Sequence, residues 1–371
     1  MPSMTKETIY VTRPSMPPLA EFLPYLERIW DSHILTNCGP LHAQLERELA
    51  EYLAVKHVAL FNNATIALVV ALRALAVQGE VITTPFSFVA TAHALLWNNI
   101  TPVFVDIDPV TLNLDPAKIE AAITPRTTAI LPVHCYGTPA ATAAIDQIAK
   151  RHGLKVIYDA AHAFGVRDRL GSVLNWGDLS ILSFHATKVF NTFEGGAIVC
   201  HTQDMKDHID RLKNFGHHGE ISVIETGING KMSEINSAFG LLQLKYVGEM
   251  IARRGAIDAL YRDGLAAIKG IECVKSFAGV ANYSYFPILV NADFPMTRDQ
   301  LYDHMKTQGV HPRRYFYPLI GEFAMYRDLP SADRANLPVA AHASDRILCL
   351  PIYPDLTAAS VQRILDIIGQ V

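Results

Sequence analysis

The segment KVIYDAAHAFG, residues 155–165, opens with a short apolar run that is typical of a buried strand and that ends on Asp159. The residues just before it, 140–152, have the pattern of a helix. The same alternation of short apolar runs and helices extends from about residue 41 to residue 201. Strands that alternate with helices predict an α/β fold, with a mainly parallel sheet flanked by helices.

The expected elements fall into two parts of the chain. Strands are expected at residues 57–61, 80–84, 102–107, 129–134, 155–159, 179–184 and 197–201, with helices at 41–53, 64–76, 87–97, 116–123 and 140–152. The second half is expected to contain helices at 233–251, 256–268, 298–308 and 358–368 and a strand at 285–289. We place a domain boundary near residue 250, so that residues 1–250 form a large domain and residues 251–371 a smaller α+β domain.

Composition limits the kinds of partner that the protein can have. Half of the 371 residues are hydrophobic and 18% are charged, which suits a large core, and the formal net charge of −4 gives no reason to expect a nucleic acid. The longest apolar stretch, residues 64–77, is interrupted by Arg73 and is too short for a membrane span. Five cysteines without a CxxC pair, and an N-terminal segment without an apolar run, predict a cytoplasmic protein with reduced thiols.

Ligands of open α/β sheets bind at the carboxyl ends of the strands, so the residues that follow each strand are candidate site residues. In this chain they are Asp159, Ser183, Lys188, Phe88 and the turn Asn63-Ala64-Thr65 at the start of a helix. Taken singly, each has a common structural explanation as a turn residue, a helix cap, a core ring or a solvated charge. The prediction of a site therefore depends on their order along the chain and on the sheet edge that they share.

This set of side chains suits pyridoxal phosphate. A helix N-terminus offers free backbone N–H groups to a phosphate, and Thr65 and Ser183 add hydroxyl donors. A buried Asp159 favours a protonated pyridine nitrogen, and Phe88 can stack on the ring. Lys188 supplies an amine that can bond to the cofactor aldehyde and, once displaced by substrate, move a proton between carbon atoms.

The sequence resembles the sugar aminotransferases of the DegT/DnrJ/EryC1/StrS family, which have fold type I of the pyridoxal-phosphate enzymes. The resemblance covers nearly the whole chain, from TNCGP at residues 36–40 onward. Its segments are NNATIAL at the phosphate turn, TTPFSFVATAHAL with Phe88, VIYDAAHAFG with Asp159, SFHATKVFNTFEGGAIV with Ser183 and Lys188, and GINGKMSEINSAFG with Asn229. It implies pyridoxal 5'-phosphate that alternates with pyridoxamine phosphate, and a homodimer in which Asn229 reaches the cofactor phosphate of the partner subunit.

Three positions bear on what the resemblance implies. The phosphate turn is commonly Ser-Gly-Thr in the family but Asn63-Ala64-Thr65 here, and because the N–H groups remain we expect phosphate binding to survive. His162 stands where glutamine commonly contacts the ring hydroxyl of the cofactor, and an imidazole can make that contact but can also titrate. Lys188 stands where dehydratase relatives have histidine, which favours transamination over dehydration.

The segment HPRRYFYPLIGEFAMYR, residues 311–327, is the candidate for binding a nucleotide sugar. Arg313, Arg314, Tyr315 and Tyr317 could hold a diphosphate and a sugar, although an ordinary surface loop explains each of them equally well. The segment is similar to one in family members that aminate carbon 4 of a 6-deoxy-4-keto hexose. The resemblance thus implies dTDP-4-dehydro-6-deoxy-D-glucose as substrate and L-glutamate as amino donor. The product would be dTDP-4-amino-4,6-dideoxy-D-glucose, a precursor for the O-antigen of lipopolysaccharide or a related glycan.

Two other functions stay open at this point. One is a related enzyme on the same fold, such as a sugar-nucleotide aminotransferase that acts on carbon 3. The other is a non-catalytic regulator that binds pyridoxal phosphate or a sugar nucleotide, although a regulator has no need of Lys188 beside Asp159. The sequence contains no HExxH or HxH motif, so we expect no metal site.

Overall fold

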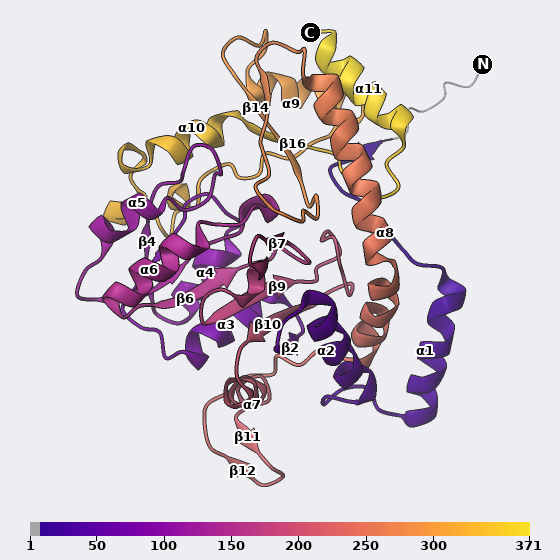
Figure 1. Ribbon diagram of the computed structural model, residues 1–371, viewed down its shortest axis with the longest axis vertical. Helices are drawn as coiled ribbons and strands as arrows, with labels where there is room; N and C mark the ends of the chain where they lie inside the picture. The colour runs from indigo at the N-terminus through magenta and orange to yellow at the C-terminus, as the bar shows by residue number, and fades with distance from the viewer. Residues whose placement is uncertain (1–7) are drawn as a thin grey trace.

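A large sheet of seven strands forms the centre of the structure, a computed structural model that describes residues 8–371 (Figure 1). The strand order is β2-β10-β9-β6-β5-β3-β4, and β10 alone runs against the other strands of this sheet. The strands are β2 (His57–Phe61), β3 (Glu80–Thr83), β4 (Thr101–Phe104), β5 (Thr127–Leu131), β6 (Lys155–Asp159), β9 (Leu179–Ser183) and β10 (Gly196–Cys200). All the strands expected in this half of the chain are present, with ends that differ by a few residues, and the α/β prediction is confirmed.

Helices cover both faces of this sheet because its strands bury side chains on both sides. They are α2 (Pro40–Leu53), α3 (Ala64–Ala74), α4 (Ala90–Trp97), α6 (Thr142–His152), α7 (Gln203–Leu212) and α8 (Glu234–Leu265). Helices α3, α4 and α7 share a hydrophobic core with Ile157 of β6. Helix α6 belongs to a different core, which contains Val156 and Tyr158, the residues on either side of Ile157 in the strand. Helices α2 and α8 cover the second face farther along, where α1 (Leu19–Ser32) packs against α8.

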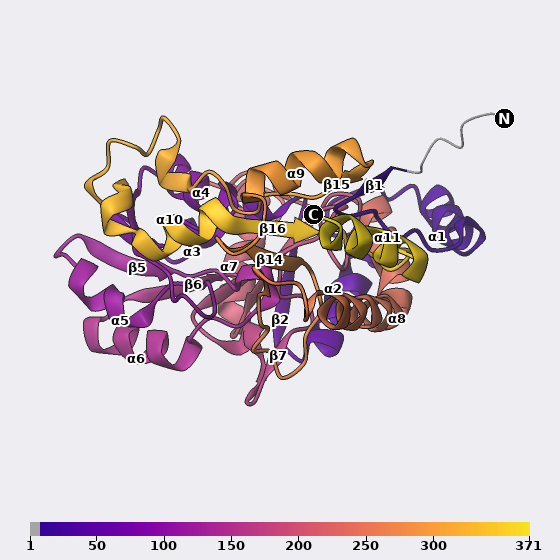
Figure 2. The same cartoon turned by 90° about the horizontal axis from the view of Figure 1, so that it is seen from above.

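A smaller antiparallel sheet lies in the upper part of the molecule in Figure 1. Its strands are β13 (Ile271–Cys273), β14 (Phe286–Val290) and β16 (Ile347–Leu350), and the neighbouring helices are α9 (Arg298–Thr307), α10 (Pro338–Arg346) and α11 (Ala358–Gly369). Strands β14 and β16 are near the centre of the view from above in Figure 2. Close to this sheet, β1 (Ile9–Tyr10) pairs in parallel with β15 (Val310–His311). The first described residues are therefore attached to the C-terminal part of the chain, which has the α+β composition that the sequence predicts.

Helix α8 connects the two parts of the molecule. The sequence predicts separate helices at residues 233–251 and 256–268, but the structure has a single helix of 32 residues from Glu234 to Leu265. Its first half packs against α1 and α2, and its second half shares a core with α11 and β14. The expected boundary near residue 250 lies inside this helix, and the division of the chain at that point stays a prediction.

Other differences from the predicted pattern are local. The predicted helix 87–97 begins at Ala90, so Ser87 and Phe88 lie in the loop before it. The predicted helix 116–123 is the short α5 (Pro116–Ile119) followed by a 3-10 turn, and β7 (Arg167–Asp168), β8 (Gly171–Ser172), β11 (His217–His218) and β12 (Ser222–Val223) are short additional strands. All five cysteines are free thiols. Within residues 8–371, no helix has both the length and the apolar character needed to cross a membrane.

Candidate active site

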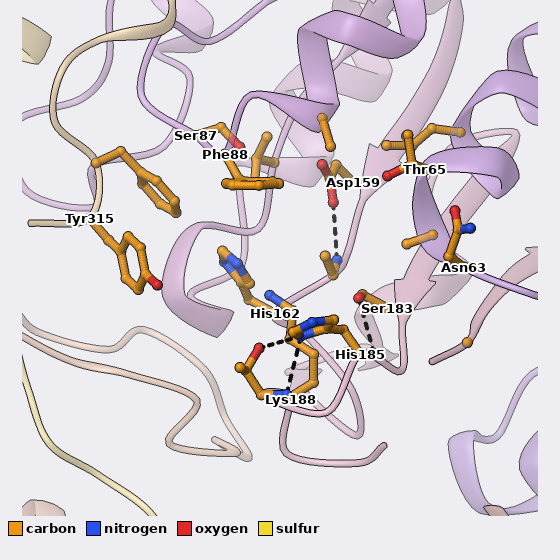
Figure 3. A pocket seen from close by; sticks show the side chains of 18 of the residues that line it. Asn63, Thr65, Ser87, Phe88, Asp159, His162, Ser183, His185, Lys188 and Tyr315 are labelled. Atoms are coloured by element: carbon orange, nitrogen blue, oxygen red, sulfur yellow. Dashed lines mark hydrogen bonds between the residues drawn. The ribbon is translucent and has the colours of Figure 1, made fainter. Parts of the chain in front are cut away.

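The carboxyl ends of strands in the large sheet border a cavity of about 380 Å³, a size that suits a small-molecule ligand (Figure 3). The predicted site residues that line it are Asn63, Ala64, Thr65, Phe88, Asp159, His162, Ser183, Lys188 and Tyr315. They come from the ends of β2, β3, β6 and β9, with Tyr315 from the C-terminal part of the chain. The fold thus brings the strand-end residues to one place.

The start of α3 forms the anion-binding wall of the cavity. Asn63 is extended and caps the helix, because its Oδ1 accepts a hydrogen bond of 2.9 Å from the backbone N–H of Ile66. The N–H groups of Ala64 and Thr65 belong to the first turn, so they have no partner within the helix and are available to an anion. Ser183, at the end of the neighbouring β9, lines the same cavity with its hydroxyl. This wall fits a phosphate group.

Asp159 places a buried carboxylate at the end of β6. Its side chain is 6% exposed, Oδ2 accepts a hydrogen bond of 2.7 Å from Oγ1 of Thr91, and Oδ1 accepts one of 3.1 Å from the N–H of Ala161. Burial raises the pKa of Asp159, while the two hydrogen bonds and the charge of Lys188 act in the opposite direction. A carboxylate held in this way fits the role of partner to a protonated ring nitrogen.

His162 is held in one tautomer. Its Nδ1 accepts a hydrogen bond of 3.3 Å from the N–H of Tyr136, and its ring stacks on Phe316 at 5.9 Å. Burial, followed by the positive charge of Lys188, lowers the pKa of His162 well below its ordinary value. The imidazole is therefore neutral, with its hydrogen on Nε2, and can donate a hydrogen bond to an oxygen in the cavity.

Lys188 lies in the loop after β9 and faces the cavity beside His162 (Figure 3). Burial lowers the pKa of its amine to about 8, and the charge of Asp159 acts against this shift. A larger fraction of the amine is therefore neutral near neutral pH than for an ordinary lysine, as a nucleophile requires. Phe88 lines the cavity with 59% of its surface exposed, so its ring is free to stack on a ligand and is not a core residue.

Four predicted residues lie outside the cavity of this single chain. The guanidinium of Arg314 lies 4.5 Å from the ring centroid of Tyr302 and 5.2 Å from that of Tyr317, and donates a hydrogen bond of 2.8 Å to Asp299. Arg313 and Tyr317 are exposed next to it. Asn229 is exposed in the loop between β12 and α8. Their roles in binding stay predictions.

Several residues of the site have no counterpart in the prediction. Ser87, His185, Thr187, Glu194, Tyr285 and Phe316 line the cavity, and Thr91 supports Asp159 from α4. His185, Thr187 and Glu194 lie within the predicted lysine segment, so their position in the sequence could have revealed them. Phe316 lies within the candidate sugar-nucleotide segment 311–327, between Tyr315 and Tyr317, whereas no motif in the sequence marks Tyr285.

A cavity with these donors, this carboxylate and this amine fits pyridoxal phosphate, and it defines the class of aminotransferases that bind this cofactor. The chain belongs to the DegT/DnrJ/EryC1/StrS aminotransferase family, whose model matches residues 19–369. The family predicted from the sequence is therefore confirmed.

Two curated proteins and one solved structure are among those similar to this chain. The chain is 54% identical to a dTDP-4-amino-4,6-dideoxy-D-glucose transaminase of Shigella dysenteriae. The 367 aligned residues cover 99% of this chain and 100% of that protein. An Escherichia coli protein of the same name is also 54% identical, with coverage of 98% and 99%. The solved structure of DesI in the presence of its TDP-sugar product matches with a TM-score of 0.94 and 36% identity, over 100% of this chain and 94% of that one.

Proposed function

We propose that this chain transfers an amino group from L-glutamate to carbon 4 of dTDP-4-dehydro-6-deoxy-D-glucose, with pyridoxal phosphate as cofactor. The products are 2-oxoglutarate and dTDP-4-amino-4,6-dideoxy-D-glucose. The observation that carries the proposal is Lys188, a partly neutral amine in the same cavity as Asp159 and the start of α3. The names and identities of the two 54% identical relatives support the choice of sugar.

The residues of the cavity have separable tasks. Pyridoxal phosphate, when bound, supplies an aldehyde that bonds to amines and a ring that takes up electron density. The start of α3 and Ser183 would hold its phosphate, Asp159 its ring nitrogen, and the Nε2–H of His162 its ring hydroxyl. Nζ of Lys188 would take the proton from the α-carbon of the amino donor and, in the second half of the reaction, would deliver a proton to carbon 4 of the sugar.

The remaining predictions concern how the sugar nucleotide and a second subunit are arranged. Tyr315 lines the cavity, and Arg313, Arg314 and Tyr317 surround it in sequence, which favours this segment as the outer rim for the diphosphate. The exposed Asn229 is in keeping with a homodimer in which it reaches the partner subunit's cofactor phosphate. Free thiols and a nucleotide-linked substrate are in keeping with a cytoplasmic enzyme that supplies O-antigen synthesis.

The test compares two keto sugars. The purified protein, loaded with pyridoxal phosphate, is given L-glutamate and either dTDP-4-dehydro-6-deoxy-D-glucose or its 3-keto isomer, and 2-oxoglutarate and the amino sugar are measured. We expect turnover of the 4-keto sugar, and a loss of about 10²- to 10⁴-fold of this activity in Lys188→Ala, because the proton-transfer amine is removed. The exposed Lys155, which forms an ion pair with Asp178 at 3.6 Å, provides the control Lys155→Ala, with activity retained.

Three outcomes would contradict the proposal in different ways. Turnover of the 3-keto sugar alone would transfer the reaction to carbon 3. Near-normal activity of Lys188→Ala would refute the role of this amine. A protein that binds the cofactor but converts neither sugar, and whose visible spectrum glutamate leaves unchanged, would be a binding protein and not an enzyme.

A further inference from the structure

Tyr285 brings a phenol hydroxyl to the amine of Lys188. Nζ of Lys188 donates a hydrogen bond of 3.3 Å to Oη of Tyr285, and the same nitrogen lies 5.7 Å from the centroid of the tyrosine ring. Both side chains line the cavity. Tyr285 directly precedes β14, so it reaches the cavity from the C-terminal part of the chain, whereas Lys188 follows β9 of the large sheet. Their contact therefore joins the two parts of the molecule at the reacting nitrogen.

The ring of Tyr285 is fixed by aromatic neighbours on several sides. It meets the ring of His162 edge to face at 4.8 Å, that of Tyr136 at 5.8 Å and that of Tyr315 at 5.7 Å. A tyrosine has only two side-chain torsions, so three ring contacts leave its hydroxyl little freedom to move away from Lys188. The hydroxyl is thus placed in advance and does not depend on the lysine for its position.

The backbone before Tyr285 is attached to the segment that holds the cofactor site. Nδ2 of Asn282 donates hydrogen bonds of 2.9 Å to the carbonyl oxygens of His162 and Phe164, and Oγ of Ser284 donates one of 2.6 Å to the His162 carbonyl. These bonds tie residues 282–284 to the loop that follows Asp159. The backbone that leads to Tyr285 is therefore fixed relative to the loop that follows Asp159.

The protonation states suit a hydrogen bond that leaves the amine reactive. Burial raises the pKa of the Tyr285 phenol above its ordinary range, whereas burial lowers the pKa of the Lys188 amine to about 8. The phenol therefore keeps its own proton while its oxygen accepts one N–H of the lysine. A neutral amine has two hydrogens and one lone pair, and holding one hydrogen restricts the directions in which the lone pair can point.

We propose that Tyr285 is a positioning residue for this reaction, whose hydroxyl holds the free Lys188 amine in place for proton transfer. No proton passes between the two groups in this step, because the shared hydrogen stays on nitrogen. The proposal deepens the proposed function and rests on it for the identity of the proton that Lys188 moves. The contact itself is a property of this chain without cofactor or substrate, so it can be tested separately from the choice of sugar.

The first measurement uses the full chain without cofactor. Acylation of Lys188 by acetic anhydride is followed against pH by mass spectrometry of its peptide, in the original protein and in Tyr285→Phe, which keeps the ring. A hydroxyl that accepts a hydrogen bond from Lys188 stabilises its ammonium form. Removal of this hydroxyl is therefore expected to lower the midpoint pH of Lys188 acylation by about one unit. Tyr261 donates a hydrogen bond of 2.9 Å to the carbonyl of Pro351 and packs on Phe286, so Tyr261→Phe is the matched control with an unchanged midpoint.

The second measurement uses the cofactor-loaded protein. We expect Tyr285→Phe to bind pyridoxal phosphate as before but to react with glutamate about ten- to a hundredfold more slowly in a single-turnover experiment. An unchanged midpoint pH for Lys188 acylation overturns the proposal whatever the rate, and a lowered midpoint with an unchanged rate overturns the positioning role in the reaction. Tyr285→Met, which also lacks the hydroxyl, replaces the phenylalanine variant if that variant does not fold. Failure to convert any sugar would count against the proposed function but would leave the midpoint test intact.

Discussion

Asp159 remains useful as an anion only because other residues oppose the effect of its burial. Its position at a strand end could be predicted, and so could those of Ser183 and Lys188, because strand ends of a parallel sheet meet at one edge. Thr91 lies within the segment quoted for Phe88, but its role could not be predicted, since it is one polar residue of a helix until the fold places its hydroxyl 2.7 Å from the carboxylate. Single residues are therefore predictable where a strand delivers them and not where packing does.

Removing the Thr91 hydroxyl should move the acid limb of the activity profile. Thr91→Val keeps the shape of the side chain but removes a hydrogen bond that lowers the pKa of Asp159. The carboxyl then protonates at a higher pH, so activity should be lost sooner as the pH falls, and kcat at neutral pH should drop about tenfold. The measurement is kcat against pH from 5 to 9.

A second buried threonine provides the comparison for this variant. Oγ1 of Thr83 donates a hydrogen bond of 2.7 Å to the carbonyl of Leu131, away from any carboxylate. Thr83→Val should lower stability but leave the acid limb where it is. Coincident profiles for Thr91→Val and the unchanged protein would show that Thr91 has no influence on Asp159.

At the scale of elements, strands and amphipathic helices were predictable, and the places where helices join were not. The gap between the predicted helices 233–251 and 256–268 contains Gly255, and yet α8 is continuous there. A Cβ at Gly255 would lie 2.9 Å from the ring of Tyr283, so this glycine admits a neighbouring ring and does not end the helix. The sequence shows that position 255 is a glycine, but only the structure shows that the ring of Tyr283 occupies the space next to it.

The contact of β10 with the start of α3 should be sensitive to one methyl group. A Cβ at Gly196 would lie 2.6 Å from the backbone nitrogen of Ala64, which is closer than such atoms can approach. Gly196→Ala should therefore displace the phosphate-binding turn and weaken the binding of pyridoxal phosphate by about tenfold or more, measured by absorbance titration. Gly248→Ala, in open space on α8, should leave the affinity unchanged. Equal affinities for the two variants would show that the turn tolerates the displacement.

At the scale of the whole molecule, family and α/β class could be predicted because long motifs and alternation extend through most of the chain. The arrangement of the C-terminal part could not, since its contacts join residues that are distant in sequence. Examples are the hydrogen bonds from the N–H groups of Val339 and Ala340 to the carboxylate of Asp106, which attach the start of α10 to the large sheet. A local sequence pattern does not predict a hydrogen-bond partner that is more than two hundred residues away.

The buried histidines predict how the stability of the whole protein depends on pH. Burial lowers the pKa of His42 to about 4, that of His134 to about 3, and that of His162 well below 6.5. Below pH 6.5 the unfolded chain takes up protons at these positions and the folded protein does not, so stability must fall as the pH falls. Each histidine contributes about 1.4 kcal/mol per pH unit, and Asp159, whose pKa is raised, offsets at most one of them.

Urea unfolding of the cofactor-free protein at fixed concentration checks this dependence. Between pH 6 and pH 5 the free energy of unfolding should decrease by about 3 kcal/mol. His134→Gln keeps an acceptor for the N–H of Ala140, which bonds to Nδ1 of His134 at 3.0 Å, and it should reduce the slope by about one proton. A free energy that stays level over this range would mean that these histidines can be protonated in the folded protein.

The pairing of β1 with β15 joins a part of the chain that is synthesised early to a part that is synthesised late. Ile9 is 3% exposed in the finished molecule, and its partner in the ladder is Val310. At about 5 to 20 residues per second, a ribosome takes roughly 15 to 60 seconds to make the chain between them. Throughout that interval β1 has no partner strand, so it must be among the last elements to pair in each newly made molecule.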